Sequence, residues 1–176
     1  MKKVLLHICC GVCALHSIDK LKKDSFLVSG FFYNPNIYPF EEYEKRCDAA
    51  REACRIFGVE FVEGAYRYDD WLKNSIKYSA EPEGGARCKE CYAMRIRQAF
   101  DFAIKNGFDY LTSTLTISPH KNSKEIFAIA YAVCADMYLP IDFKKADGFK
   151  KTAAYAREYK VYRQNYCGCE YSIHGK

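Results

Sequence analysis

A chain of 176 residues, 49% hydrophobic and 16% aromatic, is large enough for one buried core and small for two. Its longest apolar run, residues 126–135, is far shorter than the ~20 residues that cross a bilayer. The apolar N-terminal run is also too short for a signal peptide, so we expect a cytoplasmic protein with no membrane partner. A net charge of +5 favours a polyanionic partner, and ten cysteines in a cytoplasmic chain predict metal or redox chemistry rather than disulfides.

Strands and helices alternate in the apolar patterning of the chain. In chain order we expect a strand from Val4 into the first cysteines, a helix over Ala14–Lys23, a strand over Phe26–Phe32, a helix over Glu41–Phe57, a strand over Val59–Ala65, a short helix over Asp69–Ile76, a helix over Cys88–Lys105, a strand over Tyr110–Leu115, a helix capped by Ser123 and ending at Met137, a short strand over Leu139–Phe143 and a basic helix over Phe149–Tyr159.

This alternation predicts an α/β fold with an open, mostly parallel, doubly wound sheet and helices on both faces. Ligands of such sheets bind outside the carboxyl ends of the strands. The unusual loops all follow strands: the first cysteines follow the first strand, residues 33–36 follow the second and residues 118–122 follow the fourth. We therefore expect one functional edge.

Three of the ten cysteines fit the apolar faces of helices, where a thiol acts as a small hydrophobe: Cys47, Cys54 and Cys134. The other seven flank a glycine or follow a loop, which is typical of metal ligands: Cys9, Cys10, Cys13, Cys88, Cys91, Cys167 and Cys169.

The pairs Cys88-x-x-Cys91 and Cys167-x-Cys169 can form a structural zinc site, but that leaves three thiols unused. A [4Fe-4S] cluster uses four thiolates, and the remaining three suffice for an additional mononuclear iron, completed by water, substrate or a carboxylate such as Asp142. Neighbouring strand side chains point to opposite faces, so Cys9 and Cys10 are expected to serve different centres unless the backbone turns sharply between them. A thioredoxin-like role for Cys88 and Cys91 is weaker, because no strand directly precedes the pair.

A basic segment, residues 144–163, carries seven basic side chains against two acidic ones, an excess equal to the net charge of the whole chain. Such a segment beside a cysteine site suits the phosphates of RNA, although a solvated helix face explains it as well.

Six motifs of this chain resemble the cobalamin-independent epoxyqueuosine reductases of the QueH family, over nearly its whole length. They are Leu6-His7-Ile8-Cys9-Cys10-Gly11-Val12-Cys13, residues 32–37 with Tyr43 and Arg46, Arg87-Cys88-x-x-Cys91-Tyr92 with Arg95, Thr114-Leu115-x-x-Ser118-Pro119-x-Lys121, Asp142-Phe143-Lys144-Lys145, and Tyr162-Arg163-Gln164-Asn165-Tyr166-Cys167-Gly168-Cys169. Val12 and Asn165 depart from the family's pattern, in which we associate a proline and an aspartate with these positions.

The resemblance implies reduction of epoxyqueuosine to queuosine at the wobble base of tRNA, with iron–sulfur chemistry on a sheet related to HUP domains. The reaction needs two electrons, which we expect from an external one-electron donor, and two protons. Candidate proton donors near the loop edge are His120, Tyr33, Tyr166 and Asp142. Substrate binding is assigned to Asn34, Asn36, Ser118, Lys121, Lys144, Lys145 and Arg163, with Lys150 and Lys151 as further phosphate contacts and Tyr33, Tyr38 and Tyr166 as stacking partners.

Two other functions remain open. An ATP-dependent tRNA-modifying enzyme needs a glycine-rich phosphate loop after the first strand, where this chain has a single glycine among thiols. A zinc-stabilised tRNA-binding module needs only the basic segment and two cysteine pairs. In each case we expect residues 144–176 to return a cysteine pair to the functional edge.

Overall fold

The computed structural model describes residues 1–173 and contains a sheet of four parallel strands. The strand order is β3-β2-β1-β4, with β1 (Lys3–His7), β2 (Leu27–Phe32), β3 (Glu60–Glu63) and β4 (Tyr110–Ser113). The chain moves outward from β1 to β3 and then returns to the other side of β1. The direction of winding therefore changes between β1 and β4, which is where sheets of this kind bind ligands.

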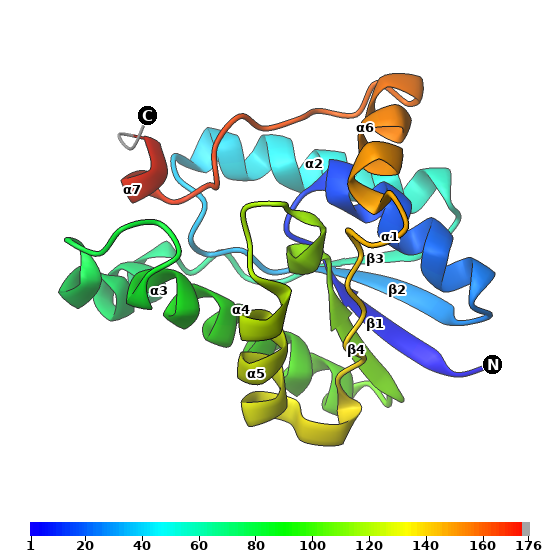
Figure 1. Ribbon diagram of the computed structural model, residues 1–176, viewed down its shortest axis with the longest axis horizontal. Coiled ribbons are helices and arrows are strands. Elements are labelled where there is room, and N and C mark those ends of the chain that lie inside the picture. Colours follow the sequence, from blue (N-terminus) through cyan, green and yellow to red (C-terminus); the bar gives the residue numbers. More distant parts are fainter. Residues whose placement is uncertain (174–176) are drawn as a thin grey trace.

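Helices cover both faces of the sheet (Figure 1). One face carries α1 (Gly11–Lys23) and α2 (Phe40–Ile56), with α6 (Gly148–Glu158) packed on α1. The other carries α3 (Tyr68–Ser75), α4 (Ala86–Lys105) and α5 (Ser123–Cys134). Short helices complete the described chain: η1 (Ile76–Tyr78), η2 (Thr114–Ile117), η3 (Ala135–Met137) and α7 (Glu170–Ile173). This arrangement confirms the predicted open, parallel, doubly wound α/β fold with helices on both faces.

The side chains of β1 alternate between two apolar cores, as the geometry of a strand requires. Val4 and Leu6 pack in the core under α1 and α2, and Leu5 packs in the core under α4 and α5. All three are fully buried, which explains why a strand covered on both faces is a continuous apolar run in the sequence.

The strand predicted over Leu139–Phe143 is wrong. Within residues 1–173, the only strand-like pairing here is an isolated parallel bridge between Leu111 and Tyr138, the residue just before this segment. Leu139 N adds one hydrogen bond to Leu111 O. Pro140 follows directly and has no backbone N–H to donate, so the ladder cannot continue.

Predicted helix starts also differ from the observed ones, and two of these differences have a clear physical reason. Helix α1 begins at Gly11 instead of Ala14, so Cys13 lies inside its first turn. A Cβ atom at Gly11 would lie 2.3 Å from the carbonyl oxygen of Ala49, so only glycine allows α1 to approach α2 this closely. Helix α5 is capped by Asn122, whose side chain accepts a hydrogen bond from Lys124 N, and not by Ser123.

The chain after α6 crosses the α2 side of the molecule and ends near α3 and the start of α4 (Figure 1). We call residues 159–173 the C-terminal tail. It carries Cys167 and Cys169 from the α1/α2 face to the opposite half of the molecule. Across residues 1–173 there is no helix with the length and apolar character needed to span a membrane.

Candidate metal centre and active-site cavity

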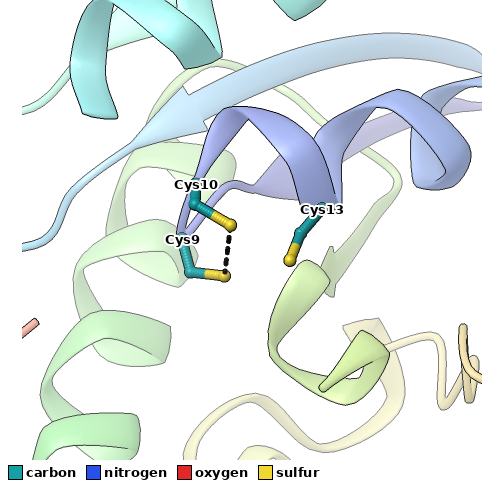
Figure 2. Close-up of side chains that lie close together, drawn as sticks. All are labelled: Cys9, Cys10 and Cys13. Atoms are coloured by element: carbon teal, nitrogen blue, oxygen red, sulfur yellow. Dashed lines mark hydrogen bonds between the residues drawn. The ribbon is translucent and has the colours of Figure 1, made fainter. Parts of the chain in front are cut away.

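Three thiols converge where β1 meets α1, as Figure 2 shows. The sulfur atoms of Cys9, Cys10 and Cys13 all lie within 4.8 Å of one another, and those of Cys9 and Cys10 are 3.9 Å apart. We call these residues the N-terminal trio. Three sulfurs at such separations are able to ligate metal ions together.

The backbone turn at Cys10 brings the trio together. Cys10 is the N-cap of α1 and is extended, with φ −165° and ψ 157°. Strand β1 ends at His7 and α1 starts at Gly11, so only three residues separate the strand from the helix. The expectation of different centres assumed that the strand continues through Cys9 and Cys10. Because the backbone turns here instead, the two sulfurs lie close enough to ligate the same ion. Cys13 then returns to the same place one helical turn later.

The hydroxyl of Thr114 joins the trio to the end of β4. Its oxygen accepts a hydrogen bond from Cys9 N at 2.9 Å, and the hydroxyl donates to Cys9 Sγ at 3.1 Å. Hydrogen bonds from the Cys10 and Cys13 thiols, with smaller contributions from Lys121 and Thr114, lower the pKa of Cys9 well below its usual value. The trio therefore favours a thiolate at Cys9, and the thiolate is the form that binds metal.

A buried polar network supports the loop from beneath. Asn34 donates to Ile8 O at 2.9 Å, and its side-chain oxygen accepts from Arg95 Nη1 at 3.0 Å. His7 lies beside it, with Nδ1 2.8 Å from Ser113 Oγ and Nε2 3.2 Å from the carbonyl of Tyr33. Burial, and then the charge of Arg95, lower the pKa of His7 to about 4, so this imidazole is neutral at pH 7.

The other four predicted ligands form a separate group, which we call the distal four: Cys88, Cys91, Cys167 and Cys169. Cys88 and Cys91 lie on the first turns of α4, and Cys167 and Cys169 lie on the C-terminal tail. Burial raises the pKa of Cys91 to about 12, and the neighbouring Cys167, Cys169 and Cys88 contribute to the same shift. The fold therefore brings cysteines separated by more than 70 residues close enough for their charges to interact.

A cavity of about 840 Å³ opens beside the trio. Its wall combines residues from the start of α1, α4, the loop after η2, α6 and the C-terminal tail. Eight residues with a predicted role in the site line it: Cys9, Cys13, Cys167, Ser118, His120, Lys121, Arg163 and Tyr166.

Lys121 is the half-buried cation of this cavity. Burial lowers its pKa, but the charges of Cys167 and Cys9 outweigh that effect, so the pKa is raised and the ammonium group stays protonated. His120 is exposed, and its backbone N–H donates to Ser118 Oγ at 3.3 Å. The cavity thus carries a fixed positive charge and an imidazole beside the thiols.

Several residues predicted to bind substrate or to act as proton donors do not line the cavity: Tyr33, Asn34, Asn36, Asp142, Lys144 and Lys145. Tyr33 follows the register of β2 and stacks beside Phe31 in the core under α4, with ring centroids 6.3 Å apart. Asn34 is occupied by the network under the trio. Asn36 is 2% exposed, and Lys145 is exposed on the surface.

Lys144 and Asp142 connect to the loop that carries His120 through hydrogen bonds and an ion pair. The ammonium group of Lys144 donates to the carbonyl oxygens of Thr116 at 3.0 Å and Lys121 at 3.2 Å, and it lies 3.4 Å from Asp142 Oδ1. These groups occupy the donors of Lys144. The side chain therefore holds the loop, whereas the sequence had suggested a contact with a substrate phosphate.

Arg95, Arg46 and Thr114 had no role predicted from the sequence. Both arginines are almost fully buried, at 4% and 2% exposure, and both line the cavity. Arg95 shares the buried face of α4 with Tyr92, Ile96 and Ala99. A charged residue on such a face needs polar partners inside the protein, and this pattern is the sequence signal that identifies it.

Known proteins of one family resemble this chain over nearly its whole length. A family model described as "Epoxyqueuosine reductase QueH" matches residues 4–175. Proteins named epoxyqueuosine reductase QueH from Streptococcus pyogenes serotype M1 and Dehalococcoides mccartyi are each 35% identical to this chain. The first match covers 96% of this chain and 69% of the relative, and the second covers 97% and 92%. A Staphylococcus epidermidis relative of the same name is 33% identical over 97% of this chain and 76% of its own.

Two solved structures share the fold at low sequence identity. One is the U34-tRNA thiolase NcsA from Methanococcus maripaludis with its [4Fe-4S] cluster, at 15% identity and a TM-score of 0.61 over 97% of this chain and 61% of that one. The other is a predicted subunit of a tRNA methyltransferase from Methanocaldococcus jannaschii, at 14% identity and a TM-score of 0.61 over 88% and 75%.

Proposed function

This chain belongs to the epoxyqueuosine reductase QueH family, and we propose that it reduces epoxyqueuosine to queuosine at the wobble base of tRNA, using an iron–sulfur cofactor. It is thus an oxidoreductase. The observation that carries the proposal is the N-terminal trio, whose three sulfurs lie within 4.8 Å of one another at the edge of a cavity.

The donor set fits such a cofactor. Thiolates are the usual ligands of iron–sulfur clusters, and Cys9 is the thiol of the trio whose surroundings favour the thiolate. We propose that the trio and the distal four together hold a [4Fe-4S] cluster and an additional mononuclear iron, which between them need more than four thiolates. When bound, iron–sulfur chemistry supplies electrons one at a time from an external one-electron donor.

The remaining chemistry belongs to the side chains of the cavity. Opening the epoxide to a carbon–carbon double bond consumes two electrons and two protons, and the oxygen leaves as water. His120 is the proposed proton donor, since it is exposed on the cavity wall, whereas Tyr33 and Asp142 do not line the cavity. Lys121 stabilises negative charge that develops near Cys9, because its ammonium group stays protonated.

The tRNA is proposed to approach over α6 and the C-terminal tail. Lys150, Lys151 and Arg163 are exposed there, and Arg163 also lines the cavity. Phe149 is 40% exposed and belongs to the same wall, so its ring is available to stack on a base of the single-stranded anticodon loop. Phosphate contacts on α6 then deliver the wobble base to the trio.

The proposal is tested by purifying the protein without oxygen, counting iron and acid-labile sulfide, and incubating it with tRNA that contains epoxyqueuosine and a chemical one-electron reductant. We expect a brown protein and the appearance of queuosine in nucleoside digests analysed by mass spectrometry. The matched control is Cys134→Ala, which removes a buried core thiol away from the cavity. A colourless, zinc-only protein that resists cluster reconstitution would support the zinc-stabilised tRNA-binding module instead.

A further inference from the structure

Arg46 on α2 binds the backbone of the C-terminal tail. Its guanidinium group donates to Cys167 O at 2.9 Å and Tyr166 O at 3.2 Å, and it lies over the Tyr166 ring at 4.8 Å from the centroid. The third edge of the guanidinium group binds Glu42 Oε1 at 2.7 Å. One buried side chain therefore connects α2 to the two residues at the start of the Cys167-Gly168-Cys169 turn.

Glu42 fixes Arg46 and also binds the tail directly. Its second carboxylate oxygen accepts a hydrogen bond from the hydroxyl of Tyr162 at 2.7 Å. A buried arginine needs such a partner, because an unpaired charge inside a protein is costly. The pair Glu42–Arg46 is thus a preassembled docking point that holds the tail at Tyr162 and again at residues 166–167.

Gly168 shows how closely the tail fits this docking point. Its φ angle is +129°, which side chains rarely allow, and a Cβ atom there would lie 2.8 Å from Arg46 Nη1. The carbonyl of Gly168 also accepts from Tyr38 N at 2.8 Å. Any larger residue at position 168 strains the turn and displaces the guanidinium group.

A second buried arginine holds the other side of the turn. Arg87 lies over the ring of Tyr171 at 4.4 Å and donates to the carbonyl oxygens of Tyr78, Ser79 and Glu81. It is adjacent to Cys88, so it positions the tail against the first turn of α4. All of these contacts use backbone carbonyls, aromatic rings or carboxylates, and none uses a thiol.

We infer that Arg46, held by Glu42, is a positioning residue that docks the C-terminal tail and sets the places of Cys167 and Cys169 before any metal binds. The docking stands on the contacts described above. Its consequence for metal assembly rests on the proposed function, in which both cysteines are ligands. The tail in this scheme differs from a zinc finger, whose fold depends on the metal.

The test is amide hydrogen exchange of the metal-free chain, read by mass spectrometry for peptides covering residues 159–173. We expect Arg46→Lys to speed exchange in the tail by about tenfold or more, because the compact ammonium group of lysine lacks the widely spaced, planar donors with which the guanidinium group reaches both carbonyls and Glu42 at once. Gly168→Ala is the second variant, since it strains the turn without removing a buried charge and leaves the two cores intact. Arg51→Gln, which removes an exposed arginine from the same helix, is the matched control.

Faster exchange confined to the tail in Arg46→Lys or Gly168→Ala, with Arg51→Gln unchanged, supports the inference. It is overturned if both variants exchange like the wild type, or if the wild-type tail is unprotected until iron is added. Iron loading separates docking by Arg46 from metal ligation by Cys167 and Cys169. If iron restores the protection of the tail in Arg46→Lys, the two thiols hold the tail through the metal. If iron binds without such recovery, the ligand role of Cys167 and Cys169 is contradicted while the docking by Arg46 stands.

Discussion

The two groups of cysteines in this protein reach their positions by different physical means. The N-terminal trio lies within five residues, and its geometry follows from a strand that turns into a helix at Cys10. The distal four come from two segments more than 70 residues apart. These segments meet because Arg46 of α2 binds the C-terminal tail and Arg87 of α4 lies over the ring of Tyr171 in that tail. The trio is built by local backbone geometry, whereas the distal four depend on tertiary contacts.

This difference implies that the two groups fail differently when they are perturbed. A change near the trio acts on sulfurs that already lie together, so its effect is chemical and local. A change near the distal four acts on a docked segment whose loss leaves the sheet intact, so its effect is one of order in the tail. Substitutions in each region distinguish the two behaviours.

The largest expected effect is that of Cys9→Ser, which breaks the trio. We expect a loss of activity of roughly 10²-fold or more, because even residues that only support metal ligands typically cost 10–100-fold. Iron and sulfide counts, visible absorption and conversion of epoxyqueuosine in tRNA measure it. Cys54→Ser, at a fully buried thiol in the core under α2, is the control that keeps its iron. Normal activity in Cys9→Ser would exclude the trio from the chemistry.

A smaller effect, on stability, is expected from Asn34→Leu, which removes the hydrogen bonds beneath the trio. The substitution leaves Ile8 O and a guanidinium nitrogen of Arg95 without partners, so the free energy of unfolding falls by about 1–3 kcal/mol. Urea denaturation measures the change. Asn74→Ala, which removes an exposed amide that bonds to Asp70 O on α3, is the matched control with little effect. Equal stability of the two variants would show that the network does not support the loop.

Sequence patterns predicted most of the fold because its strands are continuous apolar runs and its helices have clear apolar faces. The sequence also pointed to the loop that carries the trio, since a glycine among cysteines after a strand is an unusual combination. The convergence of Cys9 and Cys10 was not, because it depends on the backbone angles of Cys10. The strand predicted over Leu139–Phe143 does not form because Pro140 cannot donate to a ladder. The prediction gave more weight to the apolar residues Leu139, Ile141 and Phe143 than to this proline.

Roles of single polar residues were the hardest to predict. Lys144 and Asn34 stand in loops at the predicted edge, which suggested contacts with substrate, but both form hydrogen bonds inside the protein. Whether a lysine or asparagine side chain turns inward is decided by carbonyl groups from distant segments, such as Thr116 O for Lys144. Local sequence carries no information about those partners, and the same is true of Arg46 and the tail.

Thr114→Val sharpens the comparison at a single hydroxyl. It removes the hydrogen bond to Cys9 Sγ and the acceptor for Cys9 N while keeping the shape of the side chain. We expect about a tenfold loss of iron affinity, the lower end of the range for partners of metal ligands. Competition with a chelator measures the affinity, and Thr114→Ser, which keeps the hydroxyl, restores it. An unchanged affinity in Thr114→Val would mean that the trio needs no support from β4.

The smallest expected effect concerns the surface that neither cysteine group occupies. Replacing Lys150 and Lys151 by Gln removes two exposed cations from α6, so the slope of log affinity for tRNA against log salt falls by about 1 to 2. Iron content stays unchanged, because both side chains lie outside the cavity wall. Replacing Lys73 and Lys77, exposed on the α3 side of the sheet, is the matched control. If the control pair changes the slope and the α6 pair does not, the RNA binds on the α3 side of the sheet, and the proposed approach over α6 is wrong.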